Sequence, residues 1–214
     1  MTQPTARATP VTPAQHERYD RVVAAAEALL AGGEEAVQMK DLAQRAGLSL
    51  ATLYRYFPSK DYVLLAVTLA RYREAARKVF AEVPRGDSVR ERVTNHLLRE
   101  FRAQQRTQRL TAALTRPMNE TSRSYSAILE EIEHLHLQIV RHVAAAGGSL
   151  SEQHEKLLPI VIDIFNAASL HWQAGDFSVA EAQFQIEVGC QLLELPDEVV
   201  DADLERAAPD VRIG

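Results

Sequence analysis

The chain has 214 residues, of which 46% are apolar and 25% are charged, proportions that are ordinary for a globular protein. Its one cysteine, Cys190, excludes an intramolecular disulfide and any zinc site built on several cysteines. Residues 1–16 lack the apolar segment of a secretory signal, and no run approaches the roughly 18 apolar residues of a membrane span. We therefore expect a cytoplasmic protein.

The net charge of −5 argues against a general binder of polyanions. The charge is unevenly distributed, because residues 1–60 contain 7 Lys or Arg and 6 Asp or Glu, and the acidic excess lies in the remainder. A nearly neutral N-terminal part can still bind DNA if its cations share one face.

Hydrophobic periodicity predicts helices along the whole chain, and no segment alternates long enough with a period of two to predict a strand. The first helix ends at Gly32-Gly33, which we expect to form a left-handed cap. Further breaks are expected at Pro117, at Gly147-Gly148 and at Gly175-Asp176. The expected helices span residues 17–31, 39–46, 50–57, 60–81, 88–106, 107–117, 121–146, 151–175 and 178–194.

Residues 38–57 combine a short helix, a glycine turn and a second short helix. Leu42, Ala43 and Ala46 are expected to face inward on the first helix, and Gly47 tolerates left-handed geometry in the turn. Leu48 is expected to fill the turn, and Leu53 and Phe57 to anchor the second helix from one face. This is the pattern of a helix-turn-helix, whose second helix enters the major groove of DNA.

Burial of Leu53 and Phe57 would turn the rest of the second helix outward. Tyrosine and arginine side chains are good phosphate donors, and Arg55 can alternatively reach a guanine edge. Methyl groups of Ala51 and Thr52 suit thymine methyls, and Ser49 at the helix start can hold a phosphate. The alternative is that the tyrosines are core residues between the third and fourth helices. The DNA-binding candidates are Gln38, Lys40, Ser49, Leu50, Ala51, Thr52, Tyr54, Arg55, Tyr56 and Lys60.

The run from Thr52 to Lys60, after Gly47-Leu48-Ser49, resembles the hallmark of the TetR family of repressors. The resemblance covers roughly residues 17–65. It implies phosphate contacts by Tyr54, Tyr56 and Lys60, and base-edge contacts near Lys40, Leu50, Ala51, Thr52 and Arg55. One departure is Gln38, which replaces the Thr or Ser that usually caps the first motif helix. The phosphate contact expected from that cap is therefore in doubt, although the Gln38 amide can donate.

The resemblance also implies an all-α fold in which a three-helix helix-turn-helix domain precedes a helical bundle that binds a small effector and dimerises. The last two long helices would pair with a second copy, in keeping with the apolar run 157–172 and the stripe Phe184, Val188, Leu192 and Leu195. A buried central helix in a monomer is the alternative. The expected division is a flexible tail 1–16, a DNA-binding domain 17–60, an effector-binding and dimerisation domain 61–196 and a flexible acidic tail 197–214.

Candidates for an effector pocket combine large apolar side chains with a few polar groups. Core packing is the alternative for each of them. They are Leu98, Phe101, Arg102, Leu114, Met118, Tyr125, Leu129, Ile132, Phe165, Asn166 and Trp172.

A second resemblance concerns the effector class. Residues 36–39, 53–60 and 110–116 are similar to regulators of sterol catabolism in actinobacteria, the KstR group. That similarity implies a sterol-derived or acyl-CoA effector. Such an effector would release operator DNA by binding more tightly to one conformation of the dimer. In that conformation the two DNA-binding domains, the reading heads, are not spaced to fit the operator.

An enzyme is the competing class of function. His134, His136 and His142 share one expected helix, but their spacing does not bring them onto one metal. The chain has no Gly-rich phosphate loop, no H-E-x-x-H and no G-x-S-x-G motif, so we predict no catalytic residues, metal or cofactor. A ligand-binding module that has lost DNA binding is a further alternative, but it is disfavoured because Lys40, Arg55 and Lys60 are present. A transcriptional activator with the same reading head stays open.

Overall fold

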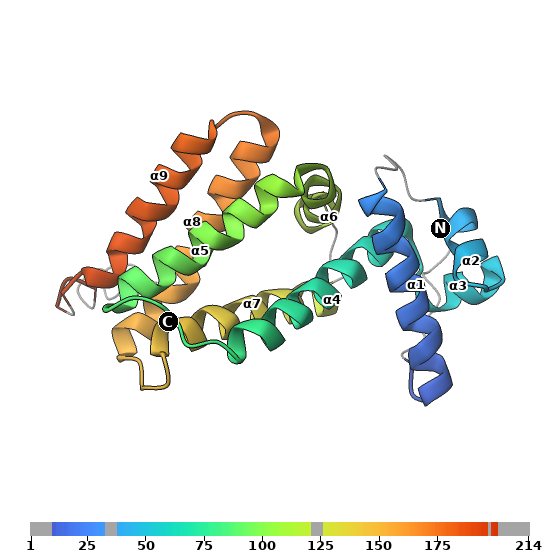
Figure 1. Cartoon of the computed structure of the whole chain (residues 1–214), viewed down its shortest axis with the longest axis horizontal. Coiled ribbons are helices and arrows are strands. Elements are labelled where there is room, and N and C mark those ends of the chain that lie inside the picture. The colour runs from blue at the N-terminus through green and yellow to red at the C-terminus, as the bar shows by residue number, and fades with distance from the viewer. Residues whose placement is uncertain (1–9, 33–37, 121–125, 197, 201–214) are drawn as a thin grey trace, which may run out of the picture. The chain divides into compact units, whose positions relative to one another are not determined.

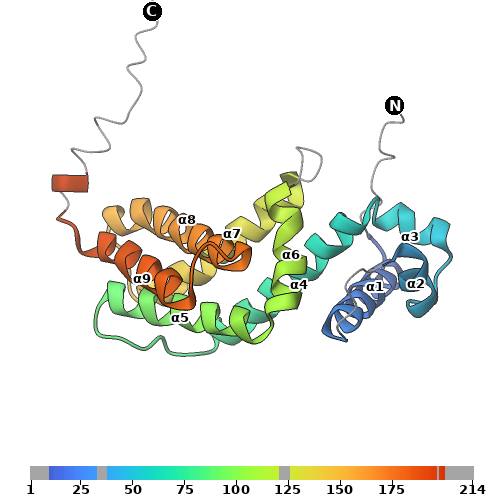
Figure 2. The ribbon, with the colours of Figure 1, turned by 90° about the horizontal axis from the view of Figure 1, so that it is seen from above.

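A computed structural model describes residues 10–32, 38–120, 126–196 and 198–200, and this part of the chain contains helices and no strand (Figures 1 and 2). None of the helices described is both long and apolar enough to cross a membrane. The α-helices are α1 (Pro13–Ala31), α2 (Met39–Arg45), α3 (Leu50–Tyr56), α4 (Lys60–Phe80), α5 (Val89–Arg106), α6 (Gln108–Glu120), α7 (Ser126–Ala145), α8 (Glu152–Ala174) and α9 (Val179–Cys190), and a short 3-10 helix follows at Gln191–Glu194.

The chain forms two compact units, whose boundaries fall inside helices. Unit 1 comprises Met1–Lys78 and Arg106–His136, and unit 2 comprises Val79–Gln105 and Leu137–Gly214. The predicted domain boundary after residue 60 stays a prediction.

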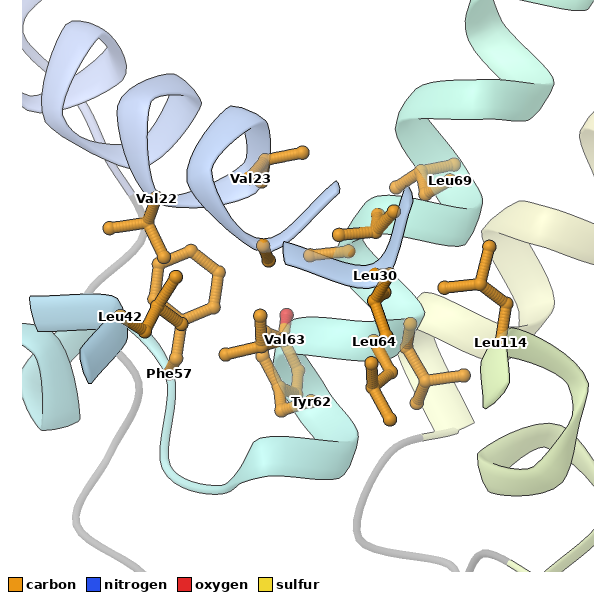
Figure 3. Close-up of a cluster of buried hydrophobic side chains, with 14 of the residues drawn as sticks. Val22, Val23, Leu30, Leu42, Phe57, Tyr62, Val63, Leu64, Leu69 and Leu114 are labelled. Atoms are coloured by element: carbon orange, nitrogen blue, oxygen red, sulfur yellow. The ribbon is translucent and has the colours of Figure 1, made fainter. Parts of the chain in front are cut away.

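The core of unit 1 joins α1, α2, α3, α6 and the first part of α4 (Figure 3). Phe57, at the end of α3, is fully buried and stacks on Tyr19 of α1 with ring centroids 4.6 Å apart. Leu64 of α4 and Leu114 of α6 belong to the same cluster. The short α2 and α3 therefore gain their stability from packing against long helices, because seven-residue helices are not stable alone.

The core of unit 2 is built around α5, α8 and α9, and α8 and α9 lie side by side (Figures 1 and 2). Phe101 packs edge-on against Trp172, with ring centroids 5.2 Å apart. Gly189 lets the two last helices approach closely, because a Cβ there would lie 2.8 Å from Cγ2 of Ile164. Cys190 is buried, and its burial raises the pKa of the thiol.

The first helix begins at Pro13 instead of the predicted residue 17. The Thr12 side chain accepts a hydrogen bond from the backbone N–H of Gln15, and the Gln15 side chain accepts from the backbone N–H of Thr12 at 3.1 Å. This capping box satisfies N–H groups at the start of the helix, and Pro13 suits its first position. Residues 13–16, assigned to the flexible tail by sequence, are therefore helical.

One predicted helix end was wrong, and one predicted cap is only partly described. The first helix ends at Ala31 as predicted, and Gly32 after it is right-handed, with φ −71°, while its predicted partner Gly33 lies outside the described residues. Pro117 lies inside α6 and does not end it. A proline inside a helix removes one backbone hydrogen bond, and α6 tolerates this loss near its last turn.

Candidate DNA-binding surface

The turn between α2 and α3 is held by backbone hydrogen bonds. Gly47 has φ +67°, in the left-handed region predicted for it, and its N–H donates to the Gln44 carbonyl at 3.1 Å. The Leu48 N–H donates to the Ala43 carbonyl at 2.9 Å, which folds the chain back onto α2. The relative orientation of the two short helices is therefore set by the backbone as well as by side-chain packing.

Three residues of the second motif helix and its end face the core. Leu53 and Phe57 are fully buried, as predicted. Tyr56 is only 1% exposed, so the prediction that it turns outward was wrong. The physical reason is helical spacing, because Tyr56 lies three residues after Leu53 and shares the inward face with it. Its hydroxyl is buried, and no hydrogen-bond partner for it is found among the described residues.

The start of α3 is capped by Ser49. Its Oγ accepts a hydrogen bond from the Thr52 N–H at 3.1 Å and is hydrogen-bonded to the Thr52 Oγ1 at 2.8 Å. The cap fixes where α3 begins and therefore which side chains it presents. By contrast, the Gln38 side chain makes no cap hydrogen bond at the start of α2, in agreement with its predicted weakness as a cap.

The remaining face of α3 is open to solvent. Leu50 is 42% exposed and Tyr54 46% exposed, which is unusual for large apolar and aromatic side chains on a short helix. Ala51 and Arg55 are also exposed, and Thr52 is half-buried. These exposed side chains form one patch because Leu53 and Tyr56 hold the opposite side of the helix in the core.

The segment that carries this patch is rich in cations. Residues 38–60 contain four of them, Lys40, Arg45, Arg55 and Lys60, against a single acidic residue, Asp41, in a chain whose net charge is −5. Lys40 and Arg55 are exposed, and Lys60 is half-buried at the first position of α4. The guanidinium of Arg55 lies 5.3 Å from the centre of the Tyr56 ring, within the range of a cation–π contact. The Tyr56 ring therefore helps to position the Arg55 guanidinium.

The effector candidates are divided between the two units. Leu98, Phe101, Phe165 and Trp172 belong to the core of unit 2, where Asn166 is exposed on α8. In unit 1, Leu114 and Ile132 are buried in the core, and Met118 and Leu129 are partly buried against the same core. Tyr125 lies outside the described residues. Arg102 is the one described candidate that lines the cleft of unit 2 discussed below. Their role in effector binding stays a prediction.

A glycine turn that fixes two short helices, with aromatic and cationic side chains exposed on the second, defines a helix-turn-helix regulator of the kind that reads DNA in the major groove. Comparison with known proteins identifies the family. Residues 22–67 match the family model described as "Bacterial regulatory proteins, tetR family". The chain belongs to the TetR family of transcriptional regulators.

The similarity extends well beyond the DNA-binding part. The chain is 29% identical over 181 residues to the HTH-type transcriptional repressor KstR of Mycobacterium tuberculosis (strain ATCC 25618 / H37Rv), covering 84% of this chain and 82% of that protein. A TetR transcriptional regulator from Rhodococcus sp. RHA1 has a similar structure, with a TM-score of 0.72, 26% identity, and coverage of 86% of this chain and 98% of that one.

A third similarity concerns the fold alone. The structure of Thermus thermophilus FadR, a TetR-family transcriptional repressor in complex with lauroyl-CoA, has a TM-score of 0.61 at 20% identity. The aligned region covers 82% of this chain and 93% of that one.

Proposed function

We propose that this regulator is a repressor that binds palindromic operator DNA as a homodimer and leaves it when a small amphiphilic effector binds. The observation that carries the DNA-binding part is the exposed face of α3, which the buried Leu53 and Tyr56 orient outward. The opposite face is buried in the core of unit 1, and the cations of this segment suit a polyanion.

Within this surface the residues divide into two kinds of contact. Tyr54, Ser49, Gln38 and Lys60 are phosphate donors that position the reading head, and they act on all sequences alike. Lys40, Leu50, Ala51, Thr52 and Arg55 reach base edges and give specificity. Tyr56 contributes by holding Arg55 in place.

The homodimer rests on an apolar face of α8 and α9. Phe184 is 62% exposed, and Ile160, Leu170 and Val188 are exposed as well. Large apolar side chains exposed on two adjacent helices are typical of an interface. A second copy is the occupant we propose, because a single helix-turn-helix usually needs two half-sites to reach useful affinity.

The repressor assignment and the effector class are supported by the relatives. The KstR protein of M. tuberculosis is named a transcriptional repressor, and T. thermophilus FadR is a repressor seen with lauroyl-CoA. We infer an acyl-CoA or sterol-derived effector for this chain. Such ligands join a large apolar body to a polar group, which suits a helical bundle.

The contacts between α6 and α4 can couple an effector to the reading head. The Thr68 hydroxyl donates to the Leu64 carbonyl at 3.0 Å and reaches the Leu114 carbonyl of α6 at 3.5 Å. The Arg116 side chain of α6 pairs with Asp61 at 3.7 Å, directly after Lys60. A shift of α6 would therefore move the start of α4, where the phosphate donor Lys60 lies. A ligand acts through this coupling only if it binds one position of α6 better than the other.

Selection of DNA from a random pool tests the proposal. The expected result is an inverted repeat with half-sites about one helical turn apart, with affinity that falls steeply with salt. Arg55→Ala should relax the preference at one base position, whereas Arg21→Ala, an exposed arginine of α1, should change nothing. Failure to enrich any sequence, also after ligand is stripped by unfolding and refolding, would contradict DNA binding. If expression of a reporter gene under operator control rises with the amount of this protein, the protein is an activator.

Dimerisation is tested separately by sedimentation. Phe184→Glu should shift the protein to a monomer and reduce operator affinity strongly, because it places a charge in the apolar face. Gln185→Glu is the matched control, since it adds the same charge at the next, exposed position. If both variants stay dimeric, the interface lies elsewhere.

A further inference from the structure

Unit 2 contains a cleft of about 830 Å³ between the end of α4, the following loop and one side of α5. This volume lies within the range of sites for small ligands. Its apolar lining residues are Val79, Val83, Pro84 and Val143. Its polar and charged lining residues are Glu82, Arg85, Arg92, Asn95, His96, Arg99 and Arg102.

The charge of this lining is opposite to that of the chain. Four arginines face one carboxylate, Glu82, although the protein carries a net charge of −5. Like charges gathered in one cleft repel each other, and the cleft focuses their field. An anion in the cleft would relieve that repulsion.

Part of the cleft is held rigidly before any ligand binds. The Arg92 guanidinium donates to the Ala144 carbonyl through Nε at 3.1 Å and Nη2 at 2.7 Å, and to the Gly86 carbonyl at 3.3 Å. The Asn95 amide donates to the Arg85 carbonyl at 3.3 Å. Gly86 has φ +135°, and a Cβ there would lie 2.9 Å from the Arg92 backbone nitrogen, so this turn requires glycine. The loop that carries Arg85 is thus tied to α5.

Two of the arginines are available to a ligand. Among the described residues, no carboxylate forms an ion pair with Arg85 or Arg102, and both side chains are exposed. Arg99 pairs with Glu82 at 3.2 Å, but both side chains of this pair are more than half exposed, so exchanging the carboxylate for another anion costs little. Guanidinium groups bind phosphate oxygens in a bidentate manner.

We propose that the arginines of this cleft bind the phosphate groups of the effector, and that its apolar lining residues contact an adjoining uncharged part of the ligand. The proposal rests on the effector-responsive function proposed above and specifies where the head of the ligand binds. Four arginines against one carboxylate suit a multiply charged head better than a single carboxylate, which would leave most of the positive charge uncompensated. Among the effector classes considered, a coenzyme A thioester has such a head.

The test uses the full-length protein and calorimetric titration with lauroyl-CoA, coenzyme A and laurate. The double variant R85A/R102A should bind lauroyl-CoA at least about tenfold more weakly, because each lost contact is a hydrogen bond to a charged group. Its affinity for laurate and for operator DNA should be unchanged. The variant R85K/R102K should recover part of the affinity. The control is R106A, an exposed arginine on the last turn of the same helix α5 that does not line the cleft.

The outcomes separate this proposal from the function on which it rests. If lauroyl-CoA releases operator DNA equally from the double variant and the unaltered protein, the cleft proposal fails and the proposed function stands. If the unaltered protein binds neither lauroyl-CoA nor coenzyme A, the cleft proposal fails together with the thioester effector, while DNA selection still tests repression. Loss of operator affinity in the double variant, with thioester binding intact, would assign the arginines to DNA and overturn the proposal.

Discussion

Two tyrosines, two residues apart on α3, allow a sharp test of the reading head. Tyr54 is 46% exposed, whereas Tyr56 is 1% exposed with a buried hydroxyl. Replacing each by phenylalanine removes only the hydroxyl group. The structure therefore predicts that Tyr54→Phe changes DNA affinity, whereas Tyr56→Phe changes the stability of the fold.

The magnitudes follow from the surroundings of each hydroxyl. A hydrogen bond from Tyr54 to a phosphate oxygen is worth about 1.5 kcal/mol, so two heads of a dimer would lose about 3 kcal/mol, or about a hundredfold in affinity. The Tyr56 hydroxyl is desolvated without a partner among the described residues, so its removal should raise the free energy of unfolding by up to about 1 kcal/mol.

Operator affinity is measured by fluorescence anisotropy and stability by urea unfolding, on both variants and the unaltered protein. Tyr54→Phe should weaken binding to the operator and to unrelated DNA by similar factors, because a phosphate contact carries no sequence information. Tyr56→Phe should leave operator affinity within about a factor of two, because its expected effect of up to about 1 kcal/mol is on folding and not on the contact with DNA. Equal losses of affinity in both variants, with no gain in stability for Tyr56→Phe, would refute this reasoning and mean that Tyr56 leaves the core on DNA.

Three substitutions and one reactivity measurement test the packing and the helix cap. Gly189→Ala should lower the free energy of unfolding by about 1–3 kcal/mol, because its Cβ would overlap Ile164, and urea unfolding measures this loss. Gly47→Ala should lower it by about 1 kcal/mol through backbone strain alone, since no atom lies within 4 Å of the added carbon, and a much larger loss would contradict that account. Ser49→Ala should cost about 1 kcal/mol as a lost cap, with weaker operator binding in the same assay. The Cys190 thiol should react with a thiol reagent only as the protein unfolds, because burial raises its pKa, and fast reaction of the folded protein would contradict its burial.

The local signals in the sequence were sufficient for the helix-turn-helix. Gly47, Ser49 and Pro58 mark the ends of α2 and α3, and the structure places those helices at Met39–Arg45 and Leu50–Tyr56. Turn and cap residues act over a few positions of the chain, so their effect is visible without knowledge of tertiary contacts. The start of α1 was missed although Thr12 and Gln15 form a recognisable capping box.

Tyr56 shows how residue type can mislead where spacing is informative. The positions 53, 56 and 57 share one helical face, and that signal was available in the sequence. The tyrosine was predicted to face outward because its hydroxyl suits a phosphate. Packing of its ring in the core of unit 1 overrides that preference.

The candidate effector site was the least predictable part. Large apolar residues such as Phe101 and Phe165 are equally suited to a pocket and to a core, and in this structure they lie in the core of unit 2. The cleft combines the end of α4, the loop with Arg85, one side of α5 and Val143 of α7. No pattern within one segment indicates that these residues meet, because only the tertiary fold brings them together.

The loop between α4 and α5 has a consequence for handling the protein. Its backbone is irregular and Arg85 is exposed, features that usually mark a cleavage site for trypsin. A protease must draw several residues into an extended conformation, and here the hydrogen bonds from Arg92 and Asn95 hold the carbonyl groups on either side of the Arg85–Gly86 bond. Digestion at that bond should therefore be slow in the native protein and fast once Arg92 is replaced. A tryptic time course thus shows whether the hydrogen bonds from Arg92 and Asn95 are intact, without any ligand or DNA.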